Sequence, residues 1–241
     1  MEIFTRTGAE MLGRWGHYLS GVTWIGLLYY FNFVQVPSFA QFEAGPRTEA
    51  IGKLVPRALW WFRWGALMTL LTGLWIIFAQ RDIGDYFDSS RGIAISTGIL
   101  LALIMFINVW AVIWPNQKIV IASAQRVAAG GEADPNAAAA GRKGVLASRT
   151  NTLLSIPMLF FMGAASHFAP LFDTNDNRGP YWILVIVVVG LLELNALGRL
   201  GGYGPEPIRK YMDSHRDTII VGFGLWVVLY LLWEIFFTGL S

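Results

Sequence analysis

The chain has 241 residues, of which 55% are hydrophobic, 15% aromatic and only 14% charged. Since soluble domains average about 25% charged residues, this chain has too few charges to cover a soluble surface. The composition therefore excludes a soluble globular enzyme, a disordered tail and a nucleic-acid-binding protein, and a net charge of +2 does not alter that. We expect an all-α, polytopic transmembrane helix bundle, a single integral membrane domain over residues 1–241 embedded in the lipid bilayer.

Six segments are apolar over about 20 residues, the length that a helix needs to cross a membrane. These predicted spans cover residues 15–37, 58–80, 93–115, 150–169, 181–200 and 217–239. The longer connection 116–149 opens with a stretch that suits an interfacial helix, Lys118–Ala129. Its later Gly, Ala and Pro content favours a solvated linker instead.

Lysine and arginine are distributed unequally between the two sides of the predicted membrane. With six spans, one side carries 5 basic residues and the other carries 13. Because basic residues are enriched in cytoplasmic loops, both termini are expected in the periplasm, for a multi-pass protein of a bacterial inner membrane. Tryptophans at the predicted membrane boundaries agree with this topology: Trp15 and Trp182 outside, and Trp60, Trp61 and Trp114 inside.

The sequence contains no cysteine. This excludes a disulfide framework, a thiolate metal site, an iron–sulfur cluster and the Cys-x-x-Cys-His attachment of a c-type haem. Any bound metal must therefore use histidine, methionine or oxygen ligands. The chain has three histidines: His17, His167 and His215.

Two of these histidines are predicted to lie at the same depth in the membrane. His17 is near the outer end of the first span, and His167 is near the outer end of the fourth. At 1.5 Å of rise per residue, each lies within about one helical turn of the outer interface. They are level with each other although 150 residues separate them, which makes them candidate axial ligands of one iron.

Glycines accompany both histidines on the same helix face. Gly21 follows His17 by four residues, and Gly163 precedes His167 by four. A porphyrin held between two imidazoles needs backbone without side chains beside its ring, which glycine provides. Trp24 continues this face on the first span. We therefore predict one haem b, with His17 and His167 as iron ligands and with Gly21, Gly163 and Trp24 beside the macrocycle.

Each of these residues also has a structural explanation. A histidine near a helix end often lies in the headgroup region with one nitrogen in water, and glycine in membrane helices commonly serves helix packing. His215 lies in a charged cytoplasmic segment and is expected to be solvated. Met158 and Met162, one turn apart, would suit a copper-handling protein, but methionine is usually packing filler. The level pair of histidines with paired glycines favours haem over these alternatives.

A second group of polar residues gathers at the cytoplasmic ends of the predicted spans. It consists of Asn32, Gln35, Asn108, Arg149 and Asn151. Such residues can hold helices together through interhelical hydrogen bonds. They can also line a polar pocket for a quinone headgroup or a polar substrate. Separately, Glu234 in the last span must find a partner or stay protonated, and its role stays open.

Three motifs, in the first, third and fourth predicted spans, follow a recognisable pattern. The first is Arg14-Trp15-x-His17 with Gly21-x-Thr23-Trp24-Ile25-Gly26 and Tyr29-Tyr30-Phe31. The second is Asn108-Val109-Trp110 with Ile113-Trp114-Pro115-Asn116-Gln117. The third is Ser148-Arg149-x-Asn151-Thr152-x-x-Ser155-x-Pro157, ending in Ser166-His167-Phe168. Together they resemble the urate oxidase N-terminal family, the membrane domain of bacterial cytochrome-linked urate hydroxylases. The first motif is more distantly similar to haem-binding membrane protoporphyrinogen oxidases and copper-resistance D proteins.

This resemblance implies a membrane-embedded cytochrome b-like oxidoreductase in purine catabolism. It implies oxidation of urate to 5-hydroxyisourate and electron transfer to a cytochrome c. Full-length urate hydroxylases usually end in a fused c-type cytochrome, and their membrane domain is generally predicted to have more spans. Because these 241 residues contain no cysteine, the electron acceptor is expected to be a separate cytochrome c or a quinone.

Two functions of different classes follow from the sequence. The first is a haem b electron-transfer protein resembling urate hydroxylase, for which no catalytic residue can be assigned. The second is a non-catalytic membrane subunit or assembly factor of a larger respiratory or oxidase complex, which would bind partner membrane subunits. Visible spectra and co-purifying chains would discriminate between them.

Overall fold

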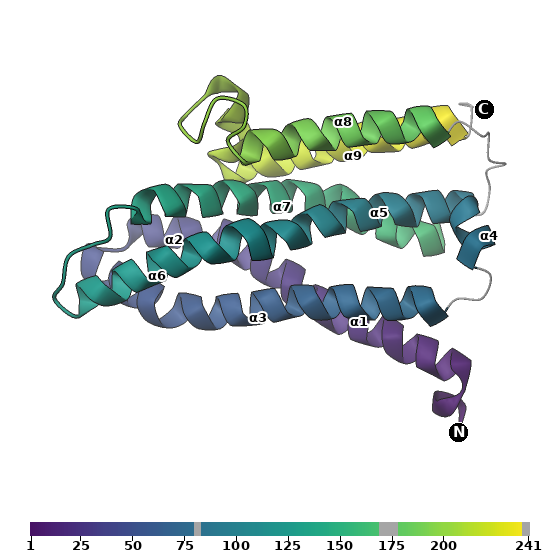
Figure 1. The fold of residues 1–241 in the computed structure, drawn as a ribbon, viewed down its shortest axis with the longest axis horizontal. Coiled ribbons are helices and arrows are strands. Elements are labelled where there is room, and N and C mark those ends of the chain that lie inside the picture. The colour runs from purple at the N-terminus through teal and green to yellow at the C-terminus, as the bar shows by residue number, and fades with distance from the viewer. Residues whose placement is uncertain (80–82, 169–177, 238–241) are drawn as a thin grey trace. The chain divides into compact units, whose positions relative to one another are not determined.

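The computed structural model describes residues 1–79, 83–168 and 178–237, which are helical almost throughout and contain no strand (Figure 1). Five helices in these ranges are long and apolar enough to cross a membrane. They are α3 (Ala44–Ala79), the continuous helix Ser90–Ala128, α7 (Ala137–His167), α8 (Arg178–Ala196) and α9 (His215–Phe237). The prediction of an all-α, multi-pass membrane protein is confirmed.

The first predicted span, 15–37, is helical but is not among these five. It falls in α1 (Arg6–Tyr29), the π-helix η2 (Tyr30–Gln35) and α2 (Val36–Gln41). Its polar residues, among them His17 and Asn32, make it less apolar than the others, so a sixth crossing stays a prediction. The last residues of three predicted spans (80, 169 and 238–239) lie outside the described residues. The short elements are η1 (Glu2–Phe4), α4 (Ile83–Asp88) and η4 (Pro207–Met212).

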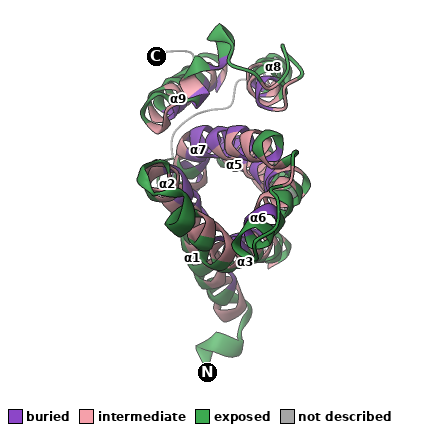
Figure 2. Ribbon diagram, turned by 90° about the vertical axis from the view of Figure 1, so that its left-hand side faces the viewer, coloured by how far each residue is buried: buried purple, intermediate pink, exposed green. Residues whose placement is uncertain are grey.

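The chain forms two compact units. Unit 1 comprises Met1–Ile83 and Phe106–Ser148, and unit 2 comprises Gly84–Met105 and Arg149–Ser241. The chain passes from one unit to the other at three points, which lie between Ile83 and Gly84, within the continuous helix Ser90–Ala128, and within α7. Most of the apolar part of α7 is buried, whereas α8 and α9 are largely exposed (Figure 2).

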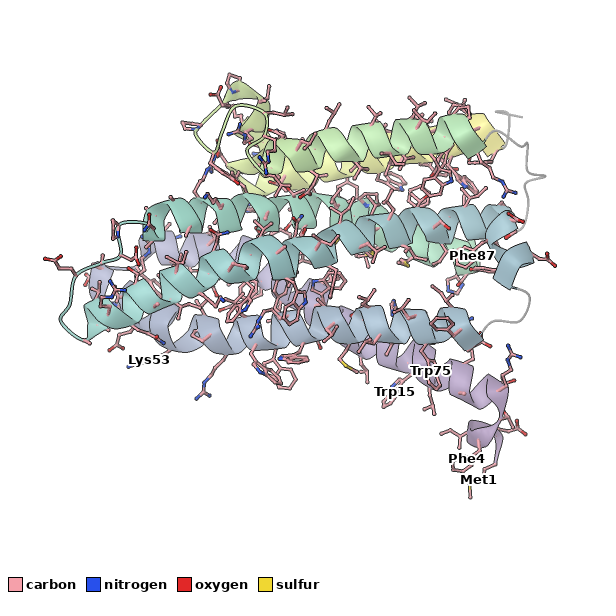
Figure 3. The ribbon with its side chains drawn as sticks, in the orientation of Figure 1. Met1, Phe4, Trp15, Lys53, Trp75 and Phe87 are labelled. Carbon is pink, nitrogen blue, oxygen red and sulfur yellow. The ribbon has the colours of Figure 1, made fainter. Side chains whose placement is uncertain are left out.

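In unit 1, α1 and α3 run antiparallel and pack closely through glycines (Figure 1). A Cβ at Gly16 would lie 3.2 Å from Thr72 Cγ2, and one at Gly65 would lie 3.2 Å from the backbone nitrogen of Trp24. Figure 3 shows Trp75 beside α1, where its indole Nε1 donates to the carbonyl of Ala9 at 3.1 Å. Without a hydrophobic driving force between helices in lipid, such small-residue contacts are what allow close packing.

Unit 1 also contains two π-helical segments, and a proline stands at the second position after the end of each. η2 (Tyr30–Gln35) precedes Pro37, and η3 (Asn108–Ile113) precedes Pro115, which opens α6 (Trp114–Ala128). Proline lacks an N–H donor, and its ring collides with the carbonyl four residues earlier in an α-helix. The wider π turn before each proline relieves that collision without ending the helix.

The connection 116–149 is not the solvated linker that we predicted. Helix α6 continues the preceding span to Ala128, and α7 begins at Ala137, so only eight residues between them are not helical. Gly130 adopts a φ of +83° after α6, and the amide of Gly131 donates to the carbonyl of Arg126. This glycine cap ends α6, and the alanines of 137–140 start α7 because alanine has the highest helix propensity.

In unit 2, side chains join α5 (Ser90–Ile107) and α7 to the last two helices. The hydroxyls of Thr97 and Tyr181 are buried and lie 2.7 Å apart, linking α5 to α8. On α9, a Cβ at Gly222 would lie 3.0 Å from the carbonyl oxygen of Leu153, so α7 and α9 approach backbone to backbone. This packing determines which face of α7, the helix that ends in His167, is turned towards α9.

The connection between α8 and α9 is organised by a buried arginine. Arg209 has no exposed surface, and its guanidinium donates to Asn195 Oδ1 at 2.8 Å and to the carbonyls of Gly204 and Leu200 at 2.8 and 2.5 Å. Tyr211 lies in the same cluster, outside the membrane-spanning helices, and burial raises the pKa of its phenol. Arg209 therefore serves as the core of this loop, besides adding to the basic count of its side.

Candidate functional site

His17 lies on α1, half-buried against α3. Its Nδ1 is 3.2 Å from the Thr72 hydroxyl oxygen, and a Cβ added to Gly73 would lie 3.2 Å from its Cε1. The imidazole is therefore wedged between a hydroxyl and a glycine on the same turn of α3. Thr72 also lines an open hollow of about 310 Å³ together with Leu12, Gly13, Leu71 and Trp75.

The predicted macrocycle face on α1 has two contrasting neighbours of His17. A Cβ at Gly21 would have nothing within 4 Å, so this position is open. Trp24 is 2% exposed, and its indole Nε1 has no hydrogen-bond partner. A buried N–H without a partner costs about 1–3 kcal/mol, so it marks Trp24 as a position at which a ligand could complete the structure.

His167 is the last residue of α7 and is exposed, and so is Gly163 one turn earlier. A Cβ at Gly163 would have nothing within 4 Å. The same face deeper in the helix is covered within unit 2, because Phe160 contacts Trp226 and Tyr230 of α9 at ring-centroid distances of 5.3 and 5.7 Å. Helix α9 thus contributes aromatic side chains beside the last turns of α7, a contact that the sequence did not predict.

Glu234 has its partner on its own helix. The Tyr230 hydroxyl donates to the Glu234 carboxylate, one turn away on α9. Tyr230 also lies near Phe168, at a centroid distance of 6.2 Å, so this pair is close to the end of α7. The carboxylate is therefore not an isolated charge in the span.

The two histidines belong to different compact units, His17 to unit 1 and His167 to unit 2. Their pairing across one iron stays a prediction. No group of three or more His, Asp or Glu side chains that could hold a metal ion occurs among the described residues. Axial haem ligation requires only two protein ligands, so it does not depend on such a cluster.

The predicted polar group divides between the units in the same way. In unit 1, Asn32 and Gln35 of η2 line a cavity of about 40 Å³. Asn32 Nδ2 donates to Ser148 Oγ at 2.8 Å, whereas the buried Gln35 Oε1 has no hydrogen-bond partner. The cavity has room for one or more water molecules, and Gln35 would accept a hydrogen bond there. Asn108, which opens η3 in unit 1, is also buried.

In unit 2, Arg149 and Asn151 are both buried in α7. Asn151 Nδ2 donates to the carbonyl of Met105 at 2.9 Å, which joins α7 to α5 as expected of an interhelical amide. Arg149 Nε and Nη1 have no hydrogen-bond partner, and Asp213 is the charged group that interacts with it electrostatically. Whether all five polar residues form one pocket stays a prediction.

Several residues that organise these sites were not predicted. Thr72 and Gly73 lie in an apolar span and follow no metal-binding pattern, so their role emerges only from the pairing of α1 with α3. Arg63 is another example, since its guanidinium carbon lies 3.5 Å from the ring centroid of Trp114. Neither Trp60, three residues before Arg63, nor Trp64, directly after it, gave a signal for this contact.

Residues 83–195 match the family model described as urate oxidase N-terminal. Over these residues the chain is therefore similar to the urate oxidase N-terminal family. The match contains the second and third motifs, including Arg149, Asn151 and His167, and confirms the predicted resemblance. The first motif, with His17, lies outside the matched residues. Neither a curated protein nor a solved structure matches the chain.

Proposed function

We propose that this protein is a membrane-embedded haem b electron-transfer protein of urate hydroxylase type, in which His17 and His167 ligate one iron. The observation that carries the proposal is the environment of His17. Its Nδ1 is engaged by Thr72, so that Nε2 is the nitrogen left for a ligand, as in most metal-binding histidines. The family match supplies the second support, since it links this type of helical domain to urate oxidation.

The donor set fits haem b better than the alternatives. With no cysteine in the chain, covalent haem attachment and thiolate ligation are excluded, whereas two imidazoles suffice for a bis-histidine haem. Gly21 and Gly163 have free space where a Cβ would stand, and the indole N–H of Trp24 is buried without a partner. When bound, such a haem would carry one electron at a time.

The overall reaction in this proposal balances without oxygen. Urate and water give 5-hydroxyisourate with release of two protons and two electrons. The electrons pass to a separate cytochrome c or to a quinone. In this proposal, urate or a quinone headgroup binds at the predicted polar group, which consists of Asn32, Gln35, Asn108, Arg149 and Asn151.

The first test is an oxidised-minus-reduced visible spectrum of the purified protein with a pyridine haemochrome assay, on protein expressed with ample haem supply. We expect b-type bands that are lost in His17→Ala and in His167→Ala. His215→Ala is the matched control, because His215 begins α9 outside the predicted ligand set, and it should keep the bands. A colourless, well-folded protein would overturn the haem proposal and favour a non-catalytic subunit or assembly factor.

A second test addresses the substrate. Anaerobic addition of urate to the oxidised protein should reduce the b-type bands, whereas a purine that is not oxidised in this way, such as adenine, should not. Bands that remain oxidised with urate would remove urate as the substrate while leaving the cytochrome in place. Purification under mild conditions would show whether partner membrane subunits accompany the chain.

The topology of the proposal places both termini in the periplasm of a bacterial inner membrane. It requires α1 to cross as a sixth span beside the five apolar helices. Reporter fusions at the C-terminus and in the α6–α7 connection should report opposite sides of the membrane, with the α6–α7 fusion cytoplasmic. A periplasmic α6–α7 fusion would contradict the assignment.

A further inference from the structure

The hydroxyl of Thr72 determines more about His17 than its position. We propose that Thr72 is a positioning residue that holds the His17 imidazole as the tautomer protonated on Nδ1, which leaves the Nε2 lone pair available to a metal. The statement about iron rests on the proposed function, whereas the tautomer itself does not.

The direction of the hydrogen bond follows from the proton count of the hydroxyl. A threonine hydroxyl has one proton to donate and can also accept. Thr72 Oγ1 lies 2.6 Å from the carbonyl oxygen of Met68, which can only accept, so the hydroxyl proton is used there. Towards His17 Nδ1, at 3.2 Å, the same oxygen must therefore act as the acceptor. The imidazole nitrogen on that side then carries the proton.

Thr72 is itself held in place. A Cβ at Gly16 would lie 3.2 Å from Thr72 Cγ2, so the methyl group rests against the glycine backbone of α1 while the hydroxyl bonds within α3. On the next residue, the missing Cβ of Gly73 gives the imidazole ring its place against α3. Gly16, Thr72 and Gly73 together leave the ring little freedom to rotate or to exchange its two nitrogens.

This arrangement has a chemical consequence for a metal-bound histidine. A ligating imidazole that donates its other N–H to an acceptor is more basic at the ligating nitrogen and keeps its ring orientation. A more basic ligand stabilises the ferric state over the ferrous state. Loss of the Thr72 hydroxyl is therefore expected to raise the reduction potential of the iron, besides releasing the tautomer.

The test is nitrogen NMR of the full chain labelled with ¹⁵N-histidine, at a pH above 8 so that the imidazoles are neutral. With three histidines, His17→Ala assigns the signals. We expect wild-type His17 to carry its proton on Nδ1, Thr72→Val to shift it towards Nε2, and Thr72→Ser to restore the wild-type pattern. Thr69→Val is the matched control, because it removes only the side-chain bond from Thr69 to the Gly65 carbonyl and keeps the Thr69 backbone, which also bonds to His17. A proton on Nε2 in the wild type, or an unchanged tautomer in Thr72→Val, would overturn the proposal.

Redox titration of the haem-loaded proteins separates this inference from the function on which it rests. We expect a positive shift of the midpoint potential in Thr72→Val, and values close to wild type in Thr72→Ser and Thr69→Val. An unchanged potential in Thr72→Val would overturn the role of Thr72 towards the iron. If the chain binds no haem, the proposed function fails, and the NMR result still decides the tautomer.

Discussion

The ends of α1 and α7 that carry the two candidate ligands differ in how well their histidines are held. His17 is half-buried, bonded to Thr72 and packed on Gly73 within unit 1. His167 is exposed at the last residue of α7, with open space at Gly163, while the aromatic side chains of α9 cover the helix one turn deeper. The orientation of His17 is thus fixed by its neighbours, whereas the orientation of His167 depends on what binds to it.

The largest expected effect is on haem binding, and it should be the same for both histidines. The two substitutions should differ in their effect on the stability of the haem-free protein. His17→Ala and His167→Ala should each remove most of the bound haem. In protein expressed with limiting haem, His17→Ala should also lower the thermal unfolding midpoint by several degrees, because it removes a packed, hydrogen-bonded side chain. His167→Ala should leave that midpoint within about 1 °C, as for most exposed positions. Equal midpoints in the two variants would break the contrast between the two ends.

Alanine substitutions at three glycines should sharpen the contrast. In a helix, Gly→Ala gains up to about 1 kcal/mol of stability where there is room. Gly21→Ala and Gly163→Ala have that room and should stabilise the haem-free protein, yet weaken haem binding if the porphyrin lies beside them. Gly73→Ala places its Cβ 3.2 Å from His17 Cε1, so the gain is offset and the imidazole moves. Thermal unfolding and haem titration measure both quantities, and a tighter haem complex in Gly163→Ala would exclude the predicted haem position.

A smaller effect is expected where indole and phenol hydrogen bonds lie near the two ends. Trp75→Phe removes the bond from Nε1 to the Ala9 carbonyl, which ties α3 to α1, and should cost about 1 kcal/mol. Tyr230→Phe removes a bond to Glu234 that lies within α9, so it should cost less in stability. Chemical unfolding of the two variants in the same detergent compares them directly, and a larger loss for Tyr230→Phe would show that the α9 pair also supports the end of α7.

The smallest effect is expected at the very start of α1. Arg6 Nε and Nη2 both donate to the carbonyl of Ala79, at 3.0 and 2.9 Å, but the contact is exposed. Arg6→Ala should therefore change the free energy of unfolding by at most about 0.5 kcal/mol. A loss of haem in this variant would mean that the N-terminal end of α1 is less firmly held than its packing on α3 indicates.

Hydropathy was sufficient to predict five membrane-spanning helices, because long apolar runs leave a chain in lipid no alternative to helix. The same reasoning failed at 116–149, where the alanines read as flexible linker extend α7 by about three turns. It also could not distinguish Arg209, the core of a loop, from the exposed arginines with which it was counted. Local composition determines whether a segment is helical or polar, whereas burial depends on residues distant in the sequence.

For the candidate site, the sequence indicated which residues are chemically suited and not which neighbours they meet. His17 was predicted from residue type and depth, but Thr72 and Gly73 become relevant only through the pairing of α1 and α3. Asn32 and Gln35 were predicted either to hold helices together by hydrogen bonds or to line a polar pocket. They divide these roles, because Asn32 bonds to Ser148 whereas Gln35 Oε1 has no hydrogen-bond partner. Such contacts depend on the rotation of each helix about its axis, and hydropathy gives no information on that rotation.

The π-helical turns have a consequence for the phase of the helices around them. In η2 the amide of Val36 bonds to the carbonyl of Phe31, five residues earlier, and in η3 that of Trp114 bonds to Val109. Each such turn accommodates one residue more than an α-helical turn, which displaces the following side chains by about 100° around the axis. A helical wheel drawn straight from His17 to Gln41 would therefore assign the later residues to the wrong face. Deleting a single residue within 30–35 should therefore convert this turn into regular α-helix and leave α2 on its present face, whereas the same deletion within a regular α-helix would rotate every following side chain by about 100°.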